Sequence, residues 1–265
     1  MFSRNLGARG ALLAFALFAS SFAQAEAPVR FNSEQPTPRV DYWQKRAASI
    51  QLDLSDPKSL GSIRLLFVGD SITDFWHLDA NPWFPGKYCG RAIWDESFGG
   101  SVPAQAALNL GVSGDRIEHV LNRLLPRSKG GEGWLDRPDL QPDTIFVMLG
   151  INNSFDAEDP ASISIYKGIL TVVASIHDQK PRSRIVIQSL LPTDDDIKNR
   201  ELVIPVNEML RKYAENTKGV EYLDLYPSFV DARGFQKRAL FNDSLHPSQA
   251  GYGVWRDRLV EFLKG

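Results

Sequence analysis

Residues 63–72 read Ile-Arg-Leu-Leu-Phe-Val-Gly-Asp-Ser-Ile, a short and nearly continuous apolar run that stops at Gly69 and is followed by two polar residues. A run of this length predicts a strand that is buried on both faces, as the strands of parallel sheets are. Four similar runs follow it along the chain, at residues 107–110, 144–149, 184–190 and 220–225. We therefore expect five buried strands.

Helical patterns lie between and after these runs. One apolar stripe at the spacing i, i+3, i+4 and i+7 is formed by Ile117, Val120, Leu121 and Leu124. Further helices are expected at residues 161–176, 201–216 and 249–263, and Ser248 is expected to cap the last of them. Strands that alternate with helices predict an α/β fold, a three-layer α/β/α sandwich with a five-stranded parallel sheet. We expect one such domain over residues 41–265.

The composition supports a packed core, since 43% of the 265 residues are hydrophobic and 23% are charged. The formal net charge of −2 argues against a nucleic-acid-binding protein, which would normally carry a basic face. The single cysteine, Cys89, excludes an intramolecular disulfide. No apolar run reaches the ~20 residues of a membrane-spanning helix, so we expect no integral membrane association.

The first 25 residues have the three parts of a secretory signal peptide. Arg4 and Arg9 precede an uninterrupted apolar stretch, and Ala23-Gln24-Ala25 has the small residues that a signal peptidase recognises. We expect cleavage after Ala25 and a secreted or periplasmic protein. The alternative is a short N-terminal helix of the mature fold. Residues 26–40 are polar and contain three prolines, which predicts a tether that leads into the domain.

Polar residues and glycines gather where three of the strands end, and again near the C-terminus. The four clusters are Gly69-Asp70-Ser71-Ile72, Gly111-Val112-Ser113-Gly114-Asp115, Gly150-Ile151-Asn152-Asn153 and Asn242-Asp243-Ser244-Leu245-His246-Pro247. In open parallel sheets a ligand binds outside the carboxyl ends of the strands. The clusters are therefore the candidate site.

The residue types in these clusters suit acyl transfer with a serine nucleophile. A serine hydroxyl becomes a good nucleophile when a histidine takes its proton, and a carboxylate orients that histidine and stabilises the imidazolium. Ser71, His246 and Asp243 are the candidates, since one turn of chain can hold the last two together. The backbone N–H groups of Ser71 and Gly114 and the side-chain amide of Asn152 are candidate donors to an oxyanion.

Each cluster alone has a simpler structural interpretation. Asp70 and Ser71 could simply cap the helix that follows them, and the glycines and asparagines could be ordinary turn residues. A single histidine near the start of a helix is usually structural. The functional interpretation depends on the joint order of the four clusters along the chain.

In this order the clusters resemble the SGNH (GDSL-type) esterase and lipase superfamily over about residues 63–263. The stretch from Asn109 to Asp115, with the helix after it, is most similar to the branch that contains the catalytic subunits of platelet-activating-factor acetylhydrolase and many secreted bacterial esterases. The resemblance implies a flavodoxin-like fold in which Ser71 is the nucleophile, His246 the base and Asp243 its orienter, with an oxyanion hole of Ser71, Gly114 and Asn152. Where the family has Gly-x-Asn-Asp, this chain has Asn153, so a local carboxylate interaction would be lost while the oxyanion donor is kept.

Six aromatic side chains lie between residues 76 and 98, a higher density than the 11% of the whole chain. An insertion directly after the nucleophile would overhang the site, where aromatic rings could stack on sugars or line an acyl pocket. The candidate substrate contacts are Asp70, Trp76, Trp83, Tyr88 and Trp94. The alternative is a small separate core that holds the insertion together.

Nothing in the sequence indicates a cofactor or a metal site. His77, His119 and His177 are far apart and lack metal-ligand spacing, and His119 is expected to be solvated because it lies off the apolar stripe. The acidic run at residues 194–196 is expected in a solvated loop rather than around a cation. The chain has no P-loop, no dinucleotide fingerprint and no Gly-x-Ser-x-Gly elbow of the α/β-hydrolases.

We therefore expect an extracytoplasmic serine esterase that hydrolyses short-chain acyl esters, foremost acetyl groups on a carbohydrate, through an acyl-enzyme on Ser71. Its substrates would be small-molecule or polysaccharide esters, and no nucleic acid is expected as a partner. Three alternatives stay open. They are a lipid-directed acetylhydrolase or lysophospholipase, an acyltransferase, and a non-catalytic carbohydrate-binding module on the same fold.

Overall fold

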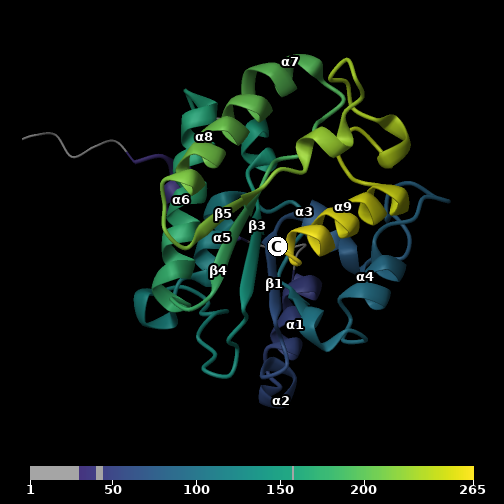
Figure 1. Cartoon of the computed structure of the whole chain (residues 1–265). Coiled ribbons are helices and arrows are strands. Elements are labelled where there is room, and N and C mark those ends of the chain that lie inside the picture. Colours follow the sequence, from purple (N-terminus) through teal and green to yellow (C-terminus); the bar gives the residue numbers. More distant parts are fainter. Residues whose placement is uncertain (1–29, 40–43, 157) are drawn as a thin grey trace, which may run out of the picture.

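The computed structural model describes residues 30–39, 44–156 and 158–265. The expected signal peptide and its cleavage site after Ala25 lie outside the described residues, as do residues 26–29 at the start of the expected tether. The described residues form one sheet with helices packed on both of its faces, as Figure 1 shows.

The five expected strands are present and parallel, in the order β2-β1-β3-β4-β5. Their bounds are β1 Leu65–Gly69, β2 Ala107–Asn109, β3 Thr144–Met148, β4 Arg184–Gln188 and β5 Val220–Leu223. The chain crosses from β1 to β2 on one side and then returns past β1 to β3 on the other. This reversal makes the carboxyl ends of β1 and β3 the expected place for a ligand.

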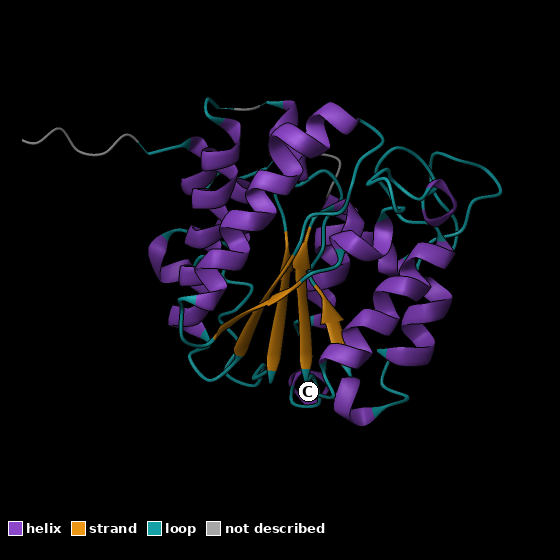
Figure 2. Ribbon diagram, turned by 45° about the horizontal axis from the view of Figure 1, so that its top comes forward, coloured by secondary structure: helices purple, strands orange, loops and turns teal. Residues whose placement is uncertain are grey.

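The helices form the two outer layers of the sandwich. Their bounds are α1 Gln44–Asp53, α2 Pro57–Leu60, α3 Ser71–Asp74, α4 Arg91–Ser97, α5 Ile117–Leu124, α6 Ala161–Gln179, α7 Asp196–Lys198, α8 Ile204–Glu215 and α9 Gln249–Phe262. Helices α5, α6 and α8 cover one face of the sheet, and α4 and α9 cover the other (Figures 1 and 2). The predicted α/β/α architecture is therefore confirmed, and Ser248 caps α9 by accepting the Gly251 N–H.

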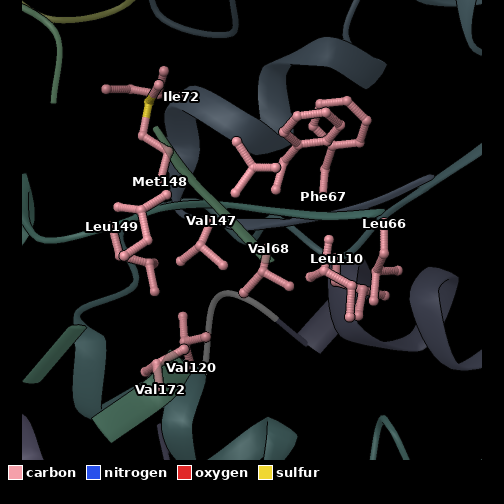
Figure 3. Packing of buried hydrophobic residues seen from close by; sticks show 14 of the residues in the cluster. Leu66, Phe67, Val68, Ile72, Leu110, Val120, Val147, Met148, Leu149 and Val172 are labelled. Carbon is pink, nitrogen blue, oxygen red and sulfur yellow. The ribbon is translucent and has the colours of Figure 1, made fainter. Parts of the chain in front are cut away.

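Strands β1 and β3 form the centre of the core. Phe67 and Val68 are neighbours in β1 and point to opposite faces of the sheet, as the alternation of side chains along a strand requires (Figure 3). Val68 and Val147 point toward Val120 of α5 and Val172 of α6 (Figure 3). All five side chains are at most 2% exposed, and burying one such side chain contributes about 1.5–3 kcal/mol. This double coverage holds firmly the two strands whose ends carry the candidate site.

Residues 30–39 of the expected tether pack against the domain. Ser33 lies in a single 3₁₀ turn, η1 (Asn32–Glu34), and its hydroxyl donates to the Ser164 carbonyl of α6 at 2.7 Å. The Thr37 N–H donates to the Glu118 carbonyl of α5 at 3.0 Å. This segment is therefore held along α5 and α6 by hydrogen bonds that its composition did not predict.

Two of the aromatic side chains assigned to substrate binding lie in the core instead. Trp76 and Trp94 are 0% and 4% exposed. The centroid of the Trp76 ring lies 4.6 Å from that of Tyr252 and 5.1 Å from that of Trp255, both in α9. The prediction that Trp76 and Trp94 contact substrate is wrong, because these large rings fill the space between α4 and α9 and bury their apolar area there.

The expected helix over residues 201–216 begins later than predicted. A π-helical turn, Asn199–Val203, connects α7 to α8. Pro205 is the second residue of α8 and has no N–H to donate to the preceding turn, so a regular helix cannot continue backward through it. Proline is tolerated at this position because the first N–H groups of a helix lack partners within it.

Candidate active site

Ser71 lies at the sharp turn between β1 and α3. Gly69 is the last residue of β1, and a Cβ at this position would lie 1.9 Å from Thr73 Oγ1, so only glycine fits. The Asp70 carboxylate accepts the Ile72 N–H at 3.0 Å and caps α3. The turn therefore holds Ser71 at the first position of a helix, directly after a central strand.

The Ser71 hydroxyl contacts His246, which lies 175 positions further along the chain. His246 Nε2 lies 2.9 Å from Ser71 Oγ, and Nδ1 lies 2.9 Å from Asp243 Oδ2. The second carboxylate oxygen of Asp243 accepts the backbone N–H groups of Leu245 and His246, each at 2.7 Å. One short turn therefore holds the carboxylate and the imidazole as a unit that faces the serine.

The surroundings keep Asp243 ionised and the His246 ring oriented. Burial by itself raises the pKa of Asp243, but the hydrogen bonds from the His246 ring and backbone outweigh it and hold that pKa below its usual value. The Phe75 ring stacks on the His246 ring, with centroids 4.8 Å apart and 20° between the planes. With Nδ1 engaged by the carboxylate, Nε2 is available to accept the serine proton.

The three candidate oxyanion donors lie in the segments that follow three neighbouring strands. Ser71 follows β1, Gly114 follows β2, and Asn152 lies in η5 (Ile151–Phe155) after β3, with β1 between the other two strands. Gly114 has a φ of +75°, a backbone conformation that residues with a Cβ rarely adopt. Asn152 Nδ2 donates to the Asp115 carbonyl at 2.7 Å, which fixes the orientation of an amide that carries two hydrogens.

A buried ion pair supports the loop after β2. Asp74 Oδ2 accepts from the Ser113 N–H at 3.1 Å and from the Ser113 hydroxyl at 2.6 Å, while Oδ1 pairs with Arg46 Nε at 2.7 Å. Arg46 of α1 also donates to the backbone carbonyls of Asn109 and Gly111. The roles of Asp74 and Arg46 could not be predicted from the sequence, because their partners are distant in the chain. The one available signal was an acidic residue within the apolar stretch after the serine.

Asp70 is not available as a substrate contact. Its side chain is buried with the residue only 1% exposed, its carboxylate caps α3, and burial raises its pKa to about 6. The assignment of Asp70 to substrate binding is therefore wrong, and the capping alternative describes its role in the fold.

Trp83 and Tyr88, the other two aromatic candidates, are 56% and 59% exposed. The centroid of the Trp83 ring lies 5.8 Å from that of His246 and 5.4 Å from that of Phe75. The Tyr88 carbonyl accepts a hydrogen bond from Asn242 Nδ2 at 2.9 Å. This bond connects the aromatic insertion to the histidine loop, residues 242–247, which carries Asp243 and His246. The structure therefore places Trp83 beside His246, and substrate contact by Trp83 and Tyr88 stays a prediction.

His119 of α5, and Asn153 of η5 packed against the start of α5, make hydrogen bonds that the sequence did not predict. His119 is half-buried rather than solvated, since its Nδ1 accepts the Arg116 N–H at 3.1 Å, and burial lowers its pKa to about 4. Asn153 accepts the Ile117 N–H at 3.0 Å and donates to Glu118 Oε2 at 2.8 Å. The amide of Asn153 thus makes a hydrogen bond to a carboxylate that an aspartate could not make while ionised.

Within the described ranges, no three His, Cys, Asp or Glu side chains lie close enough together to hold a metal ion. In the same part of the chain, no helix is both long and apolar enough to cross a membrane. The acidic run at 194–196 is exposed, and the Asp195 carboxylate caps α7 by accepting the N–H groups of Ile197 and Lys198.

Residues 67–254 match the GDSL-like lipase/acylhydrolase family. The chain belongs to this family. Platelet-activating factor acetylhydrolase IB subunit alpha1 of Homo sapiens is 30% identical to this acylhydrolase over 193 residues, which are 71% of this chain and 70% of that protein. Subunit alpha2 of Rattus norvegicus is 30% identical over 214 residues, 80% of this chain and 79% of that protein. A solved member of the lipolytic protein G-D-S-L family from Veillonella parvula matches with a TM-score of 0.55 and 23% identity, over 75% of this chain and 97% of that one.

The chain is therefore a carboxylic ester hydrolase of the GDSL acylhydrolase family, and the family predicted from the four clusters is confirmed. The matched range includes the three residues of the Ser71, Asp243 and His246 contacts and the candidate oxyanion donors Gly114 and Asn152.

Proposed function

We propose that this GDSL acylhydrolase hydrolyses esters of short acyl groups, mainly acetyl groups. The reaction proceeds through an acyl-enzyme on Ser71. The observation that supports this most directly is the unbroken line of contacts from Ser71 Oγ to His246 Nε2 and from Nδ1 to Asp243, each 2.9 Å long. It is the geometry that a serine nucleophile, a base and an orienting carboxylate require.

In the proposed first step, Ser71 Oγ attacks the ester carbonyl carbon while His246 takes the serine proton. The carbonyl oxygen becomes an anion that the N–H groups of Ser71, Gly114 and Asn152 stabilise. His246 then gives the proton to the leaving alcohol, and the acyl group stays on Ser71. In the second step His246 takes a proton from water, which attacks the acyl carbon, and the proton returns to Ser71 Oγ as the acid leaves.

An acetylated carbohydrate is the first candidate substrate. Trp83 and Tyr88 are exposed beside the histidine loop, where aromatic faces can stack on sugar rings. An expected export signal would bring the enzyme to extracellular polymers. The burial of Trp76 and Trp94 removes half of the aromatic contacts that first suggested sugar.

An acetylated lipid is the second candidate substrate. The relatives at 30% identity are named as acetylhydrolases of platelet-activating factor. Exposed apolar side chains also follow strands β1, β3 and β4 of the sheet, since Phe84 is 42%, Phe155 70% and Ile197 59% exposed. Apolar surface near a catalytic serine favours contact with lipid.

A secreted or periplasmic location also belongs to the proposal, and it depends on the first 25 residues. When the full chain is expressed in a bacterium, the exported protein should begin at Glu26. A cytoplasmic product that keeps residues 1–25 would contradict this part of the proposal.

A substrate panel tests the function, with Ser71→Ala as the matched inactive variant. The panel contains p-nitrophenyl acetate and butyrate, acetylated xylan, platelet-activating factor and a lysophospholipid. Acetate release from the small ester and from xylan supports the carbohydrate candidate, whereas release from the lipid acetyl ester alone supports the second candidate. Equal hydrolysis of acetyl and long-chain esters, or equal release by Ser71→Ala, would contradict the proposal.

A further inference from the structure

The loop that carries Gly114 is anchored by the N-terminal segment. Arg39 Nη1 donates to the Ser113 carbonyl and to Asp115 Oδ1, both at 2.7 Å, and the Arg39 side chain is only 10% exposed. Gly114 lies between these two acceptors in the sequence. We call residues Ser113, Gly114 and Asp115 the oxyanion loop.

The Ser113 carbonyl and the Gly114 N–H belong to the same peptide unit. In a planar trans peptide these two groups point in opposite directions, so holding the carbonyl also holds the direction of the N–H. Arg39 therefore orients the Gly114 donor from behind, at a distance from any substrate. Asp74 holds Ser113 through its N–H and hydroxyl, so the peptide units on both sides of Ser113 are restrained.

The guanidinium also strengthens the donor. A hydrogen bond from a charged group is stronger than a neutral one, and hydrogen bonds in series polarise each other. Asp115 is 0% exposed and pairs with Arg123 as well as with Arg39, so two guanidinium groups face one carboxylate. These two ion pairs hold the buried Asp115 side chain, and with it the oxyanion loop, in place.

The same contact extends to the second donor. The Asp115 carbonyl accepts Asn152 Nδ2 at 2.7 Å, so a displaced Asp115 would also displace the Asn152 amide. We propose that Arg39 is a positioning residue for the oxyanion hole, and that the N-terminal segment thereby contributes to the rate of the reaction. This inference rests on the proposed function, in which Gly114 and Asn152 stabilise the oxyanion.

The test compares Arg39→Ala and Arg39→Lys with a control from the same segment. Ser33→Ala is the matched control, because Ser33 anchors the segment to Ser164 and does not contact the oxyanion loop. For each protein, kcat and KM are measured on p-nitrophenyl acetate with and without added guanidinium. The rate at which a fluorophosphonate labels Ser71 is measured as well, since labelling uses the oxyanion hole without needing a natural substrate.

Arg39→Ala should lower kcat and the labelling rate by about 10- to 100-fold with KM changed by less than about 3-fold, because the oxyanion exists only in the transition state. Added guanidinium should restore part of the rate, Arg39→Lys should be intermediate, and Ser33→Ala should stay within about 2-fold of the wild type. Full activity in Arg39→Ala, an equal loss in Ser33→Ala, or no rescue by guanidinium would overturn the inference. A wild type that is neither active nor labelled would instead contradict the proposed function.

Discussion

Asn152 illustrates how one side chain serves the fold and the proposed chemistry together. One hydrogen of its amide is bound to the Asp115 carbonyl, and the other can face an oxyanion. The bond to Asp115 is what makes the second hydrogen useful, because a freely turning amide would have to be ordered during the reaction.

Asn152→Ala should therefore lower kcat by ~10²–10³, the typical cost of losing one oxyanion donor. It should lower the free energy of unfolding by only about 1 kcal/mol, the net contribution of one hydrogen bond. Steady-state kinetics and urea unfolding on the same preparation check both values. A variant that keeps wild-type kcat would remove Asn152 from the oxyanion hole.

The site residues could be predicted because each follows a strand or lies in one short turn, so that topology alone brings them together. Arg39, Arg46 and Asp74 could not be predicted, because their role depends on side chains that reach across the fold to distant carbonyls. Asp70 was placed wrongly for a related reason. Its position beside Ser71 shows proximity in the chain, whereas only the structure shows that its carboxylate turns back to cap α3.

The short helix α3 is capped by the buried Asp70 side chain, whose ionised form lowers the stability of the fold. Because burial raises the pKa of Asp70 to about 6, the folded state binds a proton between pH 3.8 and 6 that the unfolded state does not bind. Stability from this group therefore falls as pH rises through that window. Asp70→Asn keeps an acceptor for the Ile72 N–H and removes the charge.

Relative to wild type, Asp70→Asn should gain free energy of unfolding as pH rises from 4 to 8, on the order of 2 kcal/mol in total. Urea unfolding at several pH values measures the difference. Asp56→Asn is the control, because Asp56 caps α2 with a pKa lowered by hydrogen bonds and should give the opposite trend. A difference for Asp70→Asn that does not change with pH would contradict the assignment.

Asn153 makes a contact with the start of α5 that suits an amide. The Asn153 amide donates to the buried Glu118 carboxylate, which Arg116 also contacts at 2.8 Å. Asn153→Asp would place two carboxylates together and should cost about 1–2 kcal/mol of unfolding free energy at pH 8.

Combining Asn153→Asp with Glu118→Gln should restore most of that loss, because a glutamine amide can donate to the new carboxylate. A double-mutant cycle from urea unfolding measures the coupling between the two positions. A cost that persists in the double variant would show that the repulsion from Glu118 is not its cause.

Across the whole molecule, the number and the parallel direction of the strands were predictable, because buried apolar runs that alternate with helices indicate crossover connections. The insertion after the nucleophile was not predictable at the level of single rings. An aromatic side chain is equally suited to a core and to a sugar surface, and the choice between them depends on α9, which lies far away in the sequence.

The pair Trp76 and Trp83 tests this division of the insertion. Trp76→Ala should lose about 3–5 kcal/mol of unfolding free energy, as truncation of a buried tryptophan does. Trp83→Ala should lose less than about 1 kcal/mol, because Trp83 is 56% exposed, while KM for the substrate rises. Equal loss of stability in the two variants would contradict this assignment.

The proposed mechanism requires that Ser71 carries the acyl group during turnover. The most direct measurement is mass spectrometry of the peptide containing Ser71, taken from enzyme quenched in acid while it hydrolyses p-nitrophenyl acetate. We predict an acetyl group on Ser71 in the wild type, and neither the adduct nor the wild-type rate in Ser71→Ala. An acetyl adduct confined to another residue, or wild-type turnover by Ser71→Ala, would contradict this mechanism.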